Sequence, residues 1–387
     1  MNHPTIVIVA FNRPYSITRL LDSVSNGKYE FDNIPLIISI DSGNCDNHLE
    51  VVRIAKEFNW KFGSKEIILH SKNLGLREHV LTCGDLVEKY NSIIMLEDDL
   101  YVSPNYYNYA YEALKYYENC DRIAGISLYN HKKNFVAGLP FEIIPDSNDV
   151  YFLQIAASWG QCWNKKQWNN FRSWYTHNKS EILSKSPLVV RSWPDSSWLK
   201  YFIEYLVVNN LYFVYPNKSL STNFGDGGTH NKNKNVESQV PLFMGENLNF
   251  IKIEDSLNIY DSYFEILPQS LNNINHFYSN YNYSIDLYGK KELDNIKTEY
   301  LISSKTVKNY ELVKNSFGLE LKPQLLNIIN KIPGNTFSLS SKENFEDGET
   351  QFDVRNNAVL NYFYTKLDLK MLLAVILLRI KSKFFKM

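Results

Sequence analysis

The feature that most limits how this 387-residue chain can fold is an alternation of short β-branched runs with amphipathic helical patterns over residues 1–130. After Pro14, apolar residues recur at the i, i+3, i+4, i+7 spacing that buries one face of a helix. Such alternation is typical of an α/β fold with a mostly parallel sheet flanked by helices, whose ligands bind outside the carboxyl ends of the strands. Strands are expected at residues 5–11, 36–40, 66–70, 92–97 and 122–127.

Polar residues follow four of these expected strands. Neither the dinucleotide pattern G-x-G-x-x-G nor the phosphate-loop pattern G-x-x-x-x-G-K-[ST] occurs at their ends, so phosphates would have to be held in another way. The four polar segments are Asn12-Arg13, Asp41-Ser42-Gly43, Asn73 to Arg77 and Glu97-Asp98-Asp99.

The segment Glu97-Asp98-Asp99 is the most specific chemical signal in the chain. Three adjacent carboxylates repel one another unless a cation or hydrogen-bond donors compensate them. Mg²⁺ or Mn²⁺ accepts one or two carboxylate oxygens together with substrate phosphate oxygens, so a metal site beside a diphosphate is predicted. The alternative is a solvated acidic turn before a helix that begins near Ser103-Pro104.

The overall charge argues against a nucleic-acid partner. Lys and Arg number 41 against 42 Asp and Glu, which gives a formal net charge of -1. The four cysteines form no C-x-x-C pair, which argues against zinc and disulfides and favours buried free thiols. The apolar run at residues 5–11 has no preceding Lys or Arg, and no apolar stretch reaches the roughly 18 residues of a membrane span. These signals predict a cytoplasmic protein.

The C-terminal segment departs from this neutrality. Residues 371–378 are apolar without interruption, and Phe384 and Phe385 lie among the basic residues that follow. A short apolar helix with a basic, aromatic end suits the surface of an anionic membrane, so peripheral membrane contact is expected. The alternative is a terminal helix docked on the core. The basic residues after the apolar run are Arg379, Lys381, Lys383 and Lys386.

Taken together, these segments resemble a GT-A glycosyltransferase, and in particular the Golgi N-acetylglucosaminyltransferase family, which uses Glu-Asp-Asp where most members have Asp-x-Asp. The resemblance covers residues 5–235 and preserves the order of the elements. Beyond Asn12-Arg13, Asp41 and the acidic segment, the matching stretches are Ser127 to Asn130, Trp159-Gly160, Trp193 to Trp198, Ser221 to Gly225 and His230.

The resemblance implies a role for each matching residue. Asp99 would bind the metal, Glu97 and Asp98 would contact the ribose and sugar, and Asp41 would contact the uridine of a UDP-sugar. Arg13 would meet the donor phosphate or sugar. Asp195 would be the general base of an inverting transfer.

Three further residues carry open alternatives. Asp195 lies three residues before Trp198, whereas the family's acid lies closer to its tryptophan, so Asp226 is the alternative base. Arg77 would add positive charge beside the diphosphate, or lie on a helix surface. His230 would order a loop over the donor, or lie solvated in that loop.

Six of the seven tryptophans lie between residues 159 and 198. Core packing is expected for Trp163, Trp168 and Trp174. One or more of Trp159, Trp193 and Trp198 would instead stack on a sugar in the acceptor site.

The sequence therefore predicts four regions: a nucleotide-sugar-binding half (1–130), an acceptor and catalytic-base half (131–235), an extension without a recognisable site (236–355) and a basic tail (356–387). The predicted function is metal-dependent sugar transfer from a UDP-sugar to a glycan or lipid-linked acceptor in surface polysaccharide synthesis, at the inner face of the membrane. A sugar nucleotidyltransferase is the alternative enzyme, but Phe11 to Pro14 lacks the glycines that its loop requires. A glycan-binding module without catalysis is the non-enzymatic alternative.

Overall fold

The computed structural model describes residues 3–181, 183–227, 236–352 and 357–364, and the isolated residues 373, 376 and 377. The chain divides into two compact units. The first comprises Met1–Val136 and Phe141–Tyr278, and the second comprises Ala137–Pro140 and Ser279–Met387. None of the helices in the described ranges is both long and apolar enough to cross a membrane.

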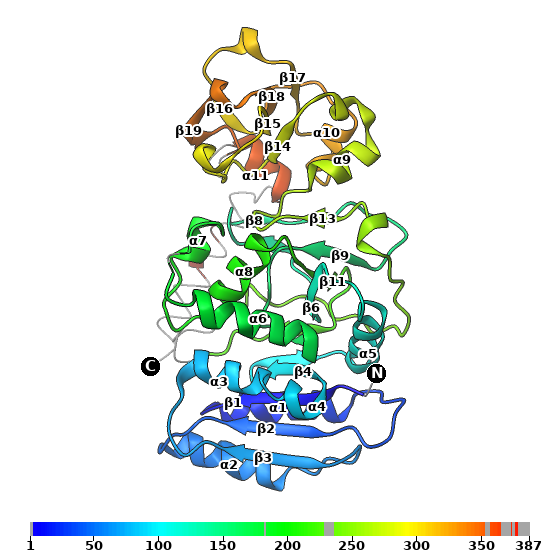
Figure 1. Ribbon diagram of the computed structural model, residues 1–387, viewed down its shortest axis with the longest axis vertical. Coiled ribbons are helices and arrows are strands. Elements are labelled where there is room, and N and C mark those ends of the chain that lie inside the picture. Colours follow the sequence, from blue (N-terminus) through cyan, green and yellow to red (C-terminus); the bar gives the residue numbers. More distant parts are fainter. Residues whose placement is uncertain are drawn as a thin grey trace. The chain divides into compact units, whose positions relative to one another are not determined.

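A mixed, mostly parallel sheet forms the centre of the first unit, in the order β13-β9-β11-β6-β10-β4-β1-β2-β3 (Figure 1). Strands β1 to β4 pair in parallel, whereas β10 runs antiparallel to both β4 and β6. The α/β fold with helices flanking a mostly parallel sheet is therefore confirmed. The strands are β1 (Thr5–Ala10), β2 (Leu36–Ile40), β3 (Lys65–Leu69), β4 (Ser92–Glu97), β6 (Ile123–Ser127), β9 (Val150–Leu153), β10 (Gln161–Asn164), β11 (Tyr212–Pro216) and β13 (Ile259–Tyr260).

Helices cover both faces of this sheet. Helices α1, α2 and α5 bury their apolar residues against the face that carries Ile6, Ile8 and Ile38. On the other face, Ser39 contacts His79 of α3, and Trp163 packs against Trp168 of α6. The helices of this unit are α1 (Pro14–Ser25), α2 (Asp46–Glu57), α3 (Gly75–Gly84), α4 (Val87–Tyr90), α5 (Tyr106–Tyr116), α6 (Lys165–Asn178), α7 (Leu188–Arg191), α8 (Leu199–Val208), α9 (Pro268–Ile274) and the 3₁₀ turn η1 (Ile253–Asp255).

A cluster of tryptophans fills the core between α6, α8 and the sheet. Trp163 and Trp168 are fully buried and Trp198 nearly so. Trp168 lies so close to the end of α3 that a Cβ atom on Gly84 would lie 1.9 Å from its ring, so glycine is required there. The expected core role of Trp163 and Trp168 matches this packing, and Trp198 joins them instead of facing a ligand.

A two-stranded antiparallel sheet brings a distant segment to the acidic residues. Strand β5 (Leu100–Val102) pairs antiparallel with β12 (Ser221–Asn223). The backbone N–H of Phe224 then donates to the carbonyl of Asp99 at 3.0 Å. The chain after β12 is thus fixed beside the end of β4. The remaining strand of the first unit is β7 (Lys133–Asn134).

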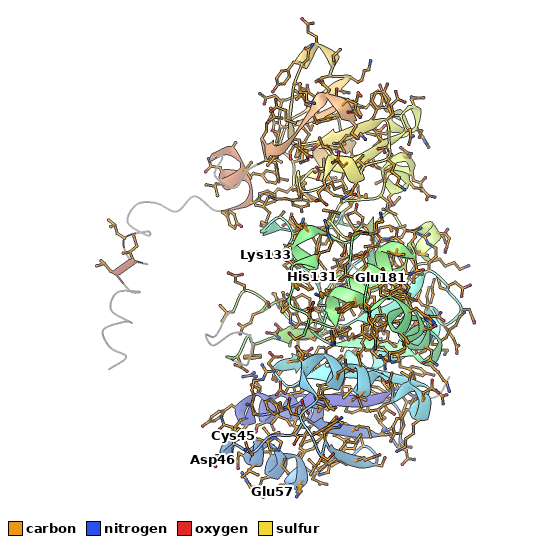
Figure 2. The ribbon with its side chains drawn as sticks, turned by 60° about the vertical axis from the view of Figure 1, so that its left-hand side comes forward. Cys45, Asp46, Glu57, His131, Lys133 and Glu181 are labelled. Carbon is orange, nitrogen blue, oxygen red and sulfur yellow. The ribbon has the colours of Figure 1, made fainter. Side chains whose placement is uncertain are left out.

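All four cysteines lie in the described part of the chain and are free thiols. Cys83 and Cys162 are buried, as expected from the sequence. Cys45 is exposed, because it directly precedes α2 on the outside of the unit; Figure 2 labels Cys45 and Asp46 at one end of that helix and Glu57 at the other.

The second unit contains a four-stranded sheet in the order β14-β15-β18-β17 and a pair formed by β16 and β19. The first pairing of the larger sheet, β14 with β15, is parallel, and the other two are antiparallel. The elements are β8 (Leu139–Pro140), β14 (Tyr283–Asp286), β15 (Tyr300–Ser303), β16 (Lys305–Val307), β17 (Asn315–Phe317), β18 (Phe337–Ser341), β19 (Phe345–Thr350), α10 (Leu325–Ile329), α11 (Asn357–Phe363), η3 (Leu293–Asn295), η4 (Tyr310–Leu312) and η5 (Lys342–Asn344), with η2 (His276–Asn280) at the boundary.

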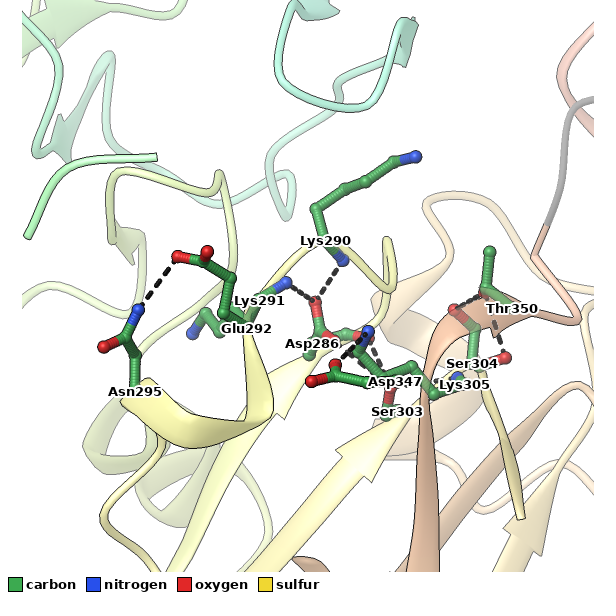
Figure 3. Close-up of polar contacts among 10 residues, drawn as sticks. All are labelled: Asp286, Lys290, Lys291, Glu292, Asn295, Ser303, Ser304, Lys305, Asp347 and Thr350. Atoms are coloured by element: carbon green, nitrogen blue, oxygen red, sulfur yellow. Dashed lines mark hydrogen bonds and ion pairs between the residues drawn. The ribbon is translucent and has the colours of Figure 1, made fainter. Parts of the chain in front are cut away.

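A buried carboxylate organises the turn after β14 (Figure 3). Asp286 Oδ1 accepts the backbone N–H groups of Lys290 at 2.7 Å and Lys291 at 3.0 Å, while Ser303 Oγ donates to Oδ2 at 3.3 Å. Burial raises the pKa of Asp286. Because these donors satisfy the carboxylate, its role here is structural.

Candidate active site

A cavity of about 540 Å³ opens in the first unit where β1, β2 and β4 end. Parallel strands present their carboxyl ends at one edge, which is the usual ligand edge of such a sheet. The structure brings six of the predicted site residues into the lining of this one cavity: Arg13, Asp41, Glu97, Asp98, Asp99 and Asp226.

Arg13 connects the end of β1 to the acidic segment. Its Nη1 donates to Asp99 Oδ2 at 2.8 Å, and its Nη2 forms an ion pair with Asp98 Oδ1. Strands β1 and β4 are neighbours in register, with Val9 opposite Glu97, so residues that follow each strand meet. Burial lowers the pKa of Arg13, but the two carboxylates outweigh this effect and raise it overall.

The acidic segment is strongly desolvated. Burial raises the pKa of Asp98 to about 6, against the opposing effect of Arg13. Burial also raises the pKa of Glu97, and the neighbouring charge of Asp99 adds to the rise. Asp99 Oδ1 is buried and accepts no hydrogen bond from the residues that the structure describes. A buried, unpaired carboxylate oxygen is costly, and it is the kind of atom that a bound cation satisfies.

A metal ion bound here would have few protein ligands. In the ranges that the structure describes, no three His, Cys, Asp or Glu side chains are grouped to hold a metal. Mg²⁺ and Mn²⁺ sites in phosphate-handling enzymes commonly use one or two carboxylates, with phosphate and water completing the shell. Asp99 Oδ1 fits that pattern, since Arg13 pairs with Asp99 Oδ2 and with Asp98 Oδ1, whereas Asp99 Oδ1 is left without a partner among the described residues.

Asp41 is buried and has a clear structural task. Its Oδ1 accepts the backbone N–H groups of Ser42 and Leu74, both at 2.8 Å, and its Oδ2 accepts that of Gly75 at 3.0 Å. The carboxylate therefore fixes the loop that leads into α3. Gly75 has a φ of +73°, which glycine adopts without the Cβ strain of other residues. Asp41 still borders the cavity.

Arg77 and Asp195 are not among the described residues that line the cavity. They contact each other: Arg77 Nη1 donates to the backbone carbonyl of Asp195 at 2.7 Å. The Asp195 side chain is 89% exposed and lies 2.6 Å from Lys200 Nζ. The hydrogen bond from Lys200 lowers the pKa of Asp195, which makes the carboxylate a weaker base.

Asp226, in contrast, lies in the cavity wall. Its Oδ2 accepts a hydrogen bond from Ser16 Oγ at 2.8 Å and forms an ion pair with Arg19. The Arg19 guanidinium stacks over the ring of Phe224 at 3.7 Å, which holds it in place. The pairing of β5 with β12 thus brings a carboxylate from a distant segment to the same cavity as Asp99.

His230 and the basic tail residues Arg379, Lys381, Lys383 and Lys386 lie outside the described residues. The basic tail follows the apolar run at residues 371–378. Of that run the structure describes Leu373, Ile376 and Leu377, which are 45–57% exposed.

Sequence reasoning did not single out His79 and left the role of Trp159 undecided, and both residues line the cavity. The Nε2 of His79 lies 2.8 Å from Ser39 Oγ; burial lowers the pKa of His79 to about 4, so the ring is neutral. A lone histidine inside a helical pattern carried no signal. Three tryptophans were expected to include one that stacks on an acceptor sugar, and of these Trp159 lines the cavity. Its ring centroid lies 4.6 Å from that of Tyr129.

Neither the family models nor the curated proteins contain a match to this chain. Solved structures resemble it weakly. They include a mannosyltransferase from Pyrobaculum calidifontis in complex with GDP-Man and Mn²⁺, with 11% identity over 43% of this chain and 45% of that chain, at a TM-score of 0.32. S. aureus TarS 1-349 in complex with UDP shares 11% identity over 56% of this chain and 59% of that chain, at a TM-score of 0.35.

The aligned region spans about half the length of each of these structures. TM-scores this low assign no activity. The function therefore rests on the chemistry of the cavity.

Proposed function

We propose that the chain is a glycosyltransferase that moves a sugar, N-acetylglucosamine or a similar one, from a UDP-sugar to a glycan or lipid-linked acceptor. The observation that carries the proposal is the convergence of Arg13, the acidic segment and Asp226 in one cavity at the carboxyl edge of the sheet. A nucleoside diphosphate sugar needs cationic groups for its phosphates, and its transfer needs a carboxylate for the acceptor. Both kinds of group are present.

The donor would lie along the strand ends. Arg13 would turn from the acidic segment toward the diphosphate, because arginine matches phosphate oxygens in a bidentate geometry. Glu97 and Asp98 would accept hydrogen bonds from ribose and sugar hydroxyls, and the Asp41-fixed loop would border the uracil. Asp99 would hold Mn²⁺ or Mg²⁺, which supplies positive charge to the departing diphosphate when bound.

The reaction needs a base for the acceptor hydroxyl. The hydroxyl oxygen attacks the anomeric carbon while the bond from that carbon to the diphosphate oxygen breaks, and the electron pair leaves with UDP. The hydroxyl proton passes to a carboxylate. Asp226 is supported by its place in the cavity wall, and Asp195 by its resemblance to the family's base. The Asp226 side chain is 20% exposed and that of Asp195 is 89% exposed, which favours Asp226.

Two further parts of the proposal concern the acceptor. Trp159, in the cavity wall, would stack on the apolar face of an acceptor sugar. The basic tail would hold the enzyme at the inner face of an anionic membrane, near a lipid-linked acceptor of surface polysaccharide synthesis.

Product analysis with a panel of UDP-sugars and Mn²⁺ tests the proposal. A transferase releases free UDP with one of the donors, and faster when its acceptor is present. A sugar nucleotidyltransferase instead exchanges a sugar phosphate with UTP, and a glycan-binding module does neither. Either of the last two outcomes overturns the proposal.

A further inference from the structure

A second cavity, of about 430 Å³, lies in the first unit between helices α6 and α8. Ile123 at the start of β6 and Leu211, just before β11, contribute to its floor. Strands β4 and β6 both run antiparallel to β10, so they run parallel to each other. The second cavity therefore lies at the amino edge of the sheet, opposite the edge where β4 ends at the acidic segment.

Two aromatic rings form one side of this cavity. Trp174 of α6 is half-buried and Tyr205 of α8 is buried, and their ring centroids lie 5.6 Å apart at 49°. Phe171 packs 5.7 Å from Tyr205 on the core side. The two rings that line the cavity are thus held by the core and present a fixed apolar surface.

Polar groups with spare hydrogen-bonding capacity line the rest. Within the described residues, four groups have no hydrogen-bond partner: the Asn170 amide, the Ser173 hydroxyl, the Trp174 indole N–H and the Tyr205 hydroxyl. The side-chain Nδ2 of Asn209 donates to the backbone carbonyl of Tyr205 at 2.9 Å, which leaves the side-chain oxygen of Asn209 available to a ligand. Asn170, Ser173 and Asn209 are exposed and Trp174 is half-buried, so a ligand that enters from solvent can reach these groups.

The charge of the lining excludes an anionic ligand. None of the described residues that line it is Lys, Arg or His. Its one carboxylate, Asp121, is paired with Lys166 Nζ at 2.6 Å. The lining residues therefore offer a phosphate or nucleotide no cation, unlike the cavity that Arg13 lines.

We propose that this second cavity binds a neutral sugar residue. Sugars offer an apolar C–H face for an aromatic ring and hydroxyls for amide and hydroxyl side chains, and the cavity supplies both, at a volume within the range of small-molecule sites. Binding here does not depend on transfer chemistry. In a glycan-extending enzyme, such a site would hold a part of the glycan remote from the reacting end.

Saturation-transfer NMR of the full chain tests this inference. The probes are glucose, galactose, mannose, N-acetylglucosamine and N-acetylgalactosamine, measured in the presence of saturating UDP and Mn²⁺ so that the donor cavity is occupied. At least one sugar should bind. Asn170→Ala and Tyr205→Phe should each weaken its binding by about 3- to 10-fold, the factor for one lost hydrogen bond.

Asn169→Ala is the matched control, because Asn169 is the neighbour of Asn170 on α6 but donates to Glu88 at 2.6 Å, away from the cavity. It should leave sugar binding unchanged. Tyr205→Phe keeps the buried ring, so a loss there reports the hydroxyl and not unfolding.

Three results would overturn the inference: no sugar of the panel binds, the Asn170 and Tyr205 variants bind as the parent does, or inorganic phosphate displaces the sugar. Each can occur whether or not the protein transfers sugar from UDP, so failure here is separable from failure of the proposed function.

Discussion

Arg13 Nη1 lies 2.8 Å from Asp99 Oδ2, so a cation of the protein itself pairs with this carboxylate, while the other oxygen of Asp99 has no partner among the described residues. The same guanidinium pairs with Asp98. A donor that draws Arg13 toward its phosphates would leave these carboxylates to a divalent cation. This link between donor and metal motivates the first prediction.

Asp99→Asn should abolish Mn²⁺-dependent binding of UDP and lower transfer by about 100-fold or more, because the amide keeps the shape but loses the charge that binds a cation. Isothermal titration with UDP, with and without Mn²⁺, measures the first effect. Thermal unfolding should stay close to that of the parent chain. Retention of metal-dependent UDP binding would refute the role of Asp99.

Asp226→Asn should keep UDP-sugar binding and lower turnover by roughly 100-fold, as expected when a general base is lost. Asp195→Asn is the matched comparison, since Asp195 is exposed and paired with Lys200. Its turnover should stay within a few-fold of the parent value. The opposite pattern in steady-state kinetics would assign the base to Asp195.

His131→Leu should reduce the loss of stability in acid. His131, labelled in Figure 2, is buried among aromatic rings, its Nε2 has no partner among the described residues, and burial lowers its pKa to about 3. Below pH 6.5, the ordinary pKa of histidine, His131 binds a proton in the unfolded chain. In the folded chain it binds none until the pH approaches 3, so stability is lost as the pH falls from 6.5 toward 3.

At pH 5 this loss amounts to about 2 kcal/mol for one histidine, and at pH 7.5 it is negligible. Urea unfolding at the two pH values should therefore show a smaller difference for His131→Leu than for the parent. Equal pH dependence in the parent and His131→Leu would contradict the prediction.

Gly84→Ala should destabilise the fold by about 1–3 kcal/mol or more, because the added methyl would lie 1.9 Å from the Trp168 ring and must push apart a packed core. Thr82→Ala changes an exposed residue of the same helix and should have a much smaller effect. Denaturant midpoints compare the two. A Gly84→Ala midpoint equal to that of the parent would contradict the packing around Trp168.

Deletion of residues 370–387 should release the protein from anionic vesicles in a flotation assay and spare hydrolysis of soluble UDP-sugar. The segment has five Lys or Arg and no Asp or Glu, and each such charge contributes about 1 kcal/mol near an anionic surface. The attraction should weaken as salt rises. Unfolding or aggregation of the truncated protein would identify the segment as a core helix instead.

Local sequence determined the framework of the first unit. The unbroken apolar runs in residues 5–10 and 92–97 and the helical spacing after Pro14 arise from which side chains must be buried, and that requirement acts within a few residues. Because strands of such a sheet end at a common edge, the sequence also placed the acidic segment at the ligand edge. The structure has both features.

Tertiary structure decided which distant residues reach that edge. Asp226 enters the cavity because β12 pairs with β5, and Asp195 stays outside because Lys200 and Arg77 hold its segment at the surface. The second cavity likewise exists because α6 and α8 pack over the starts of β6 and β11. Strand pairing and helix packing depend on the summed burial of many residues far apart in the chain, and no local pattern encodes that sum.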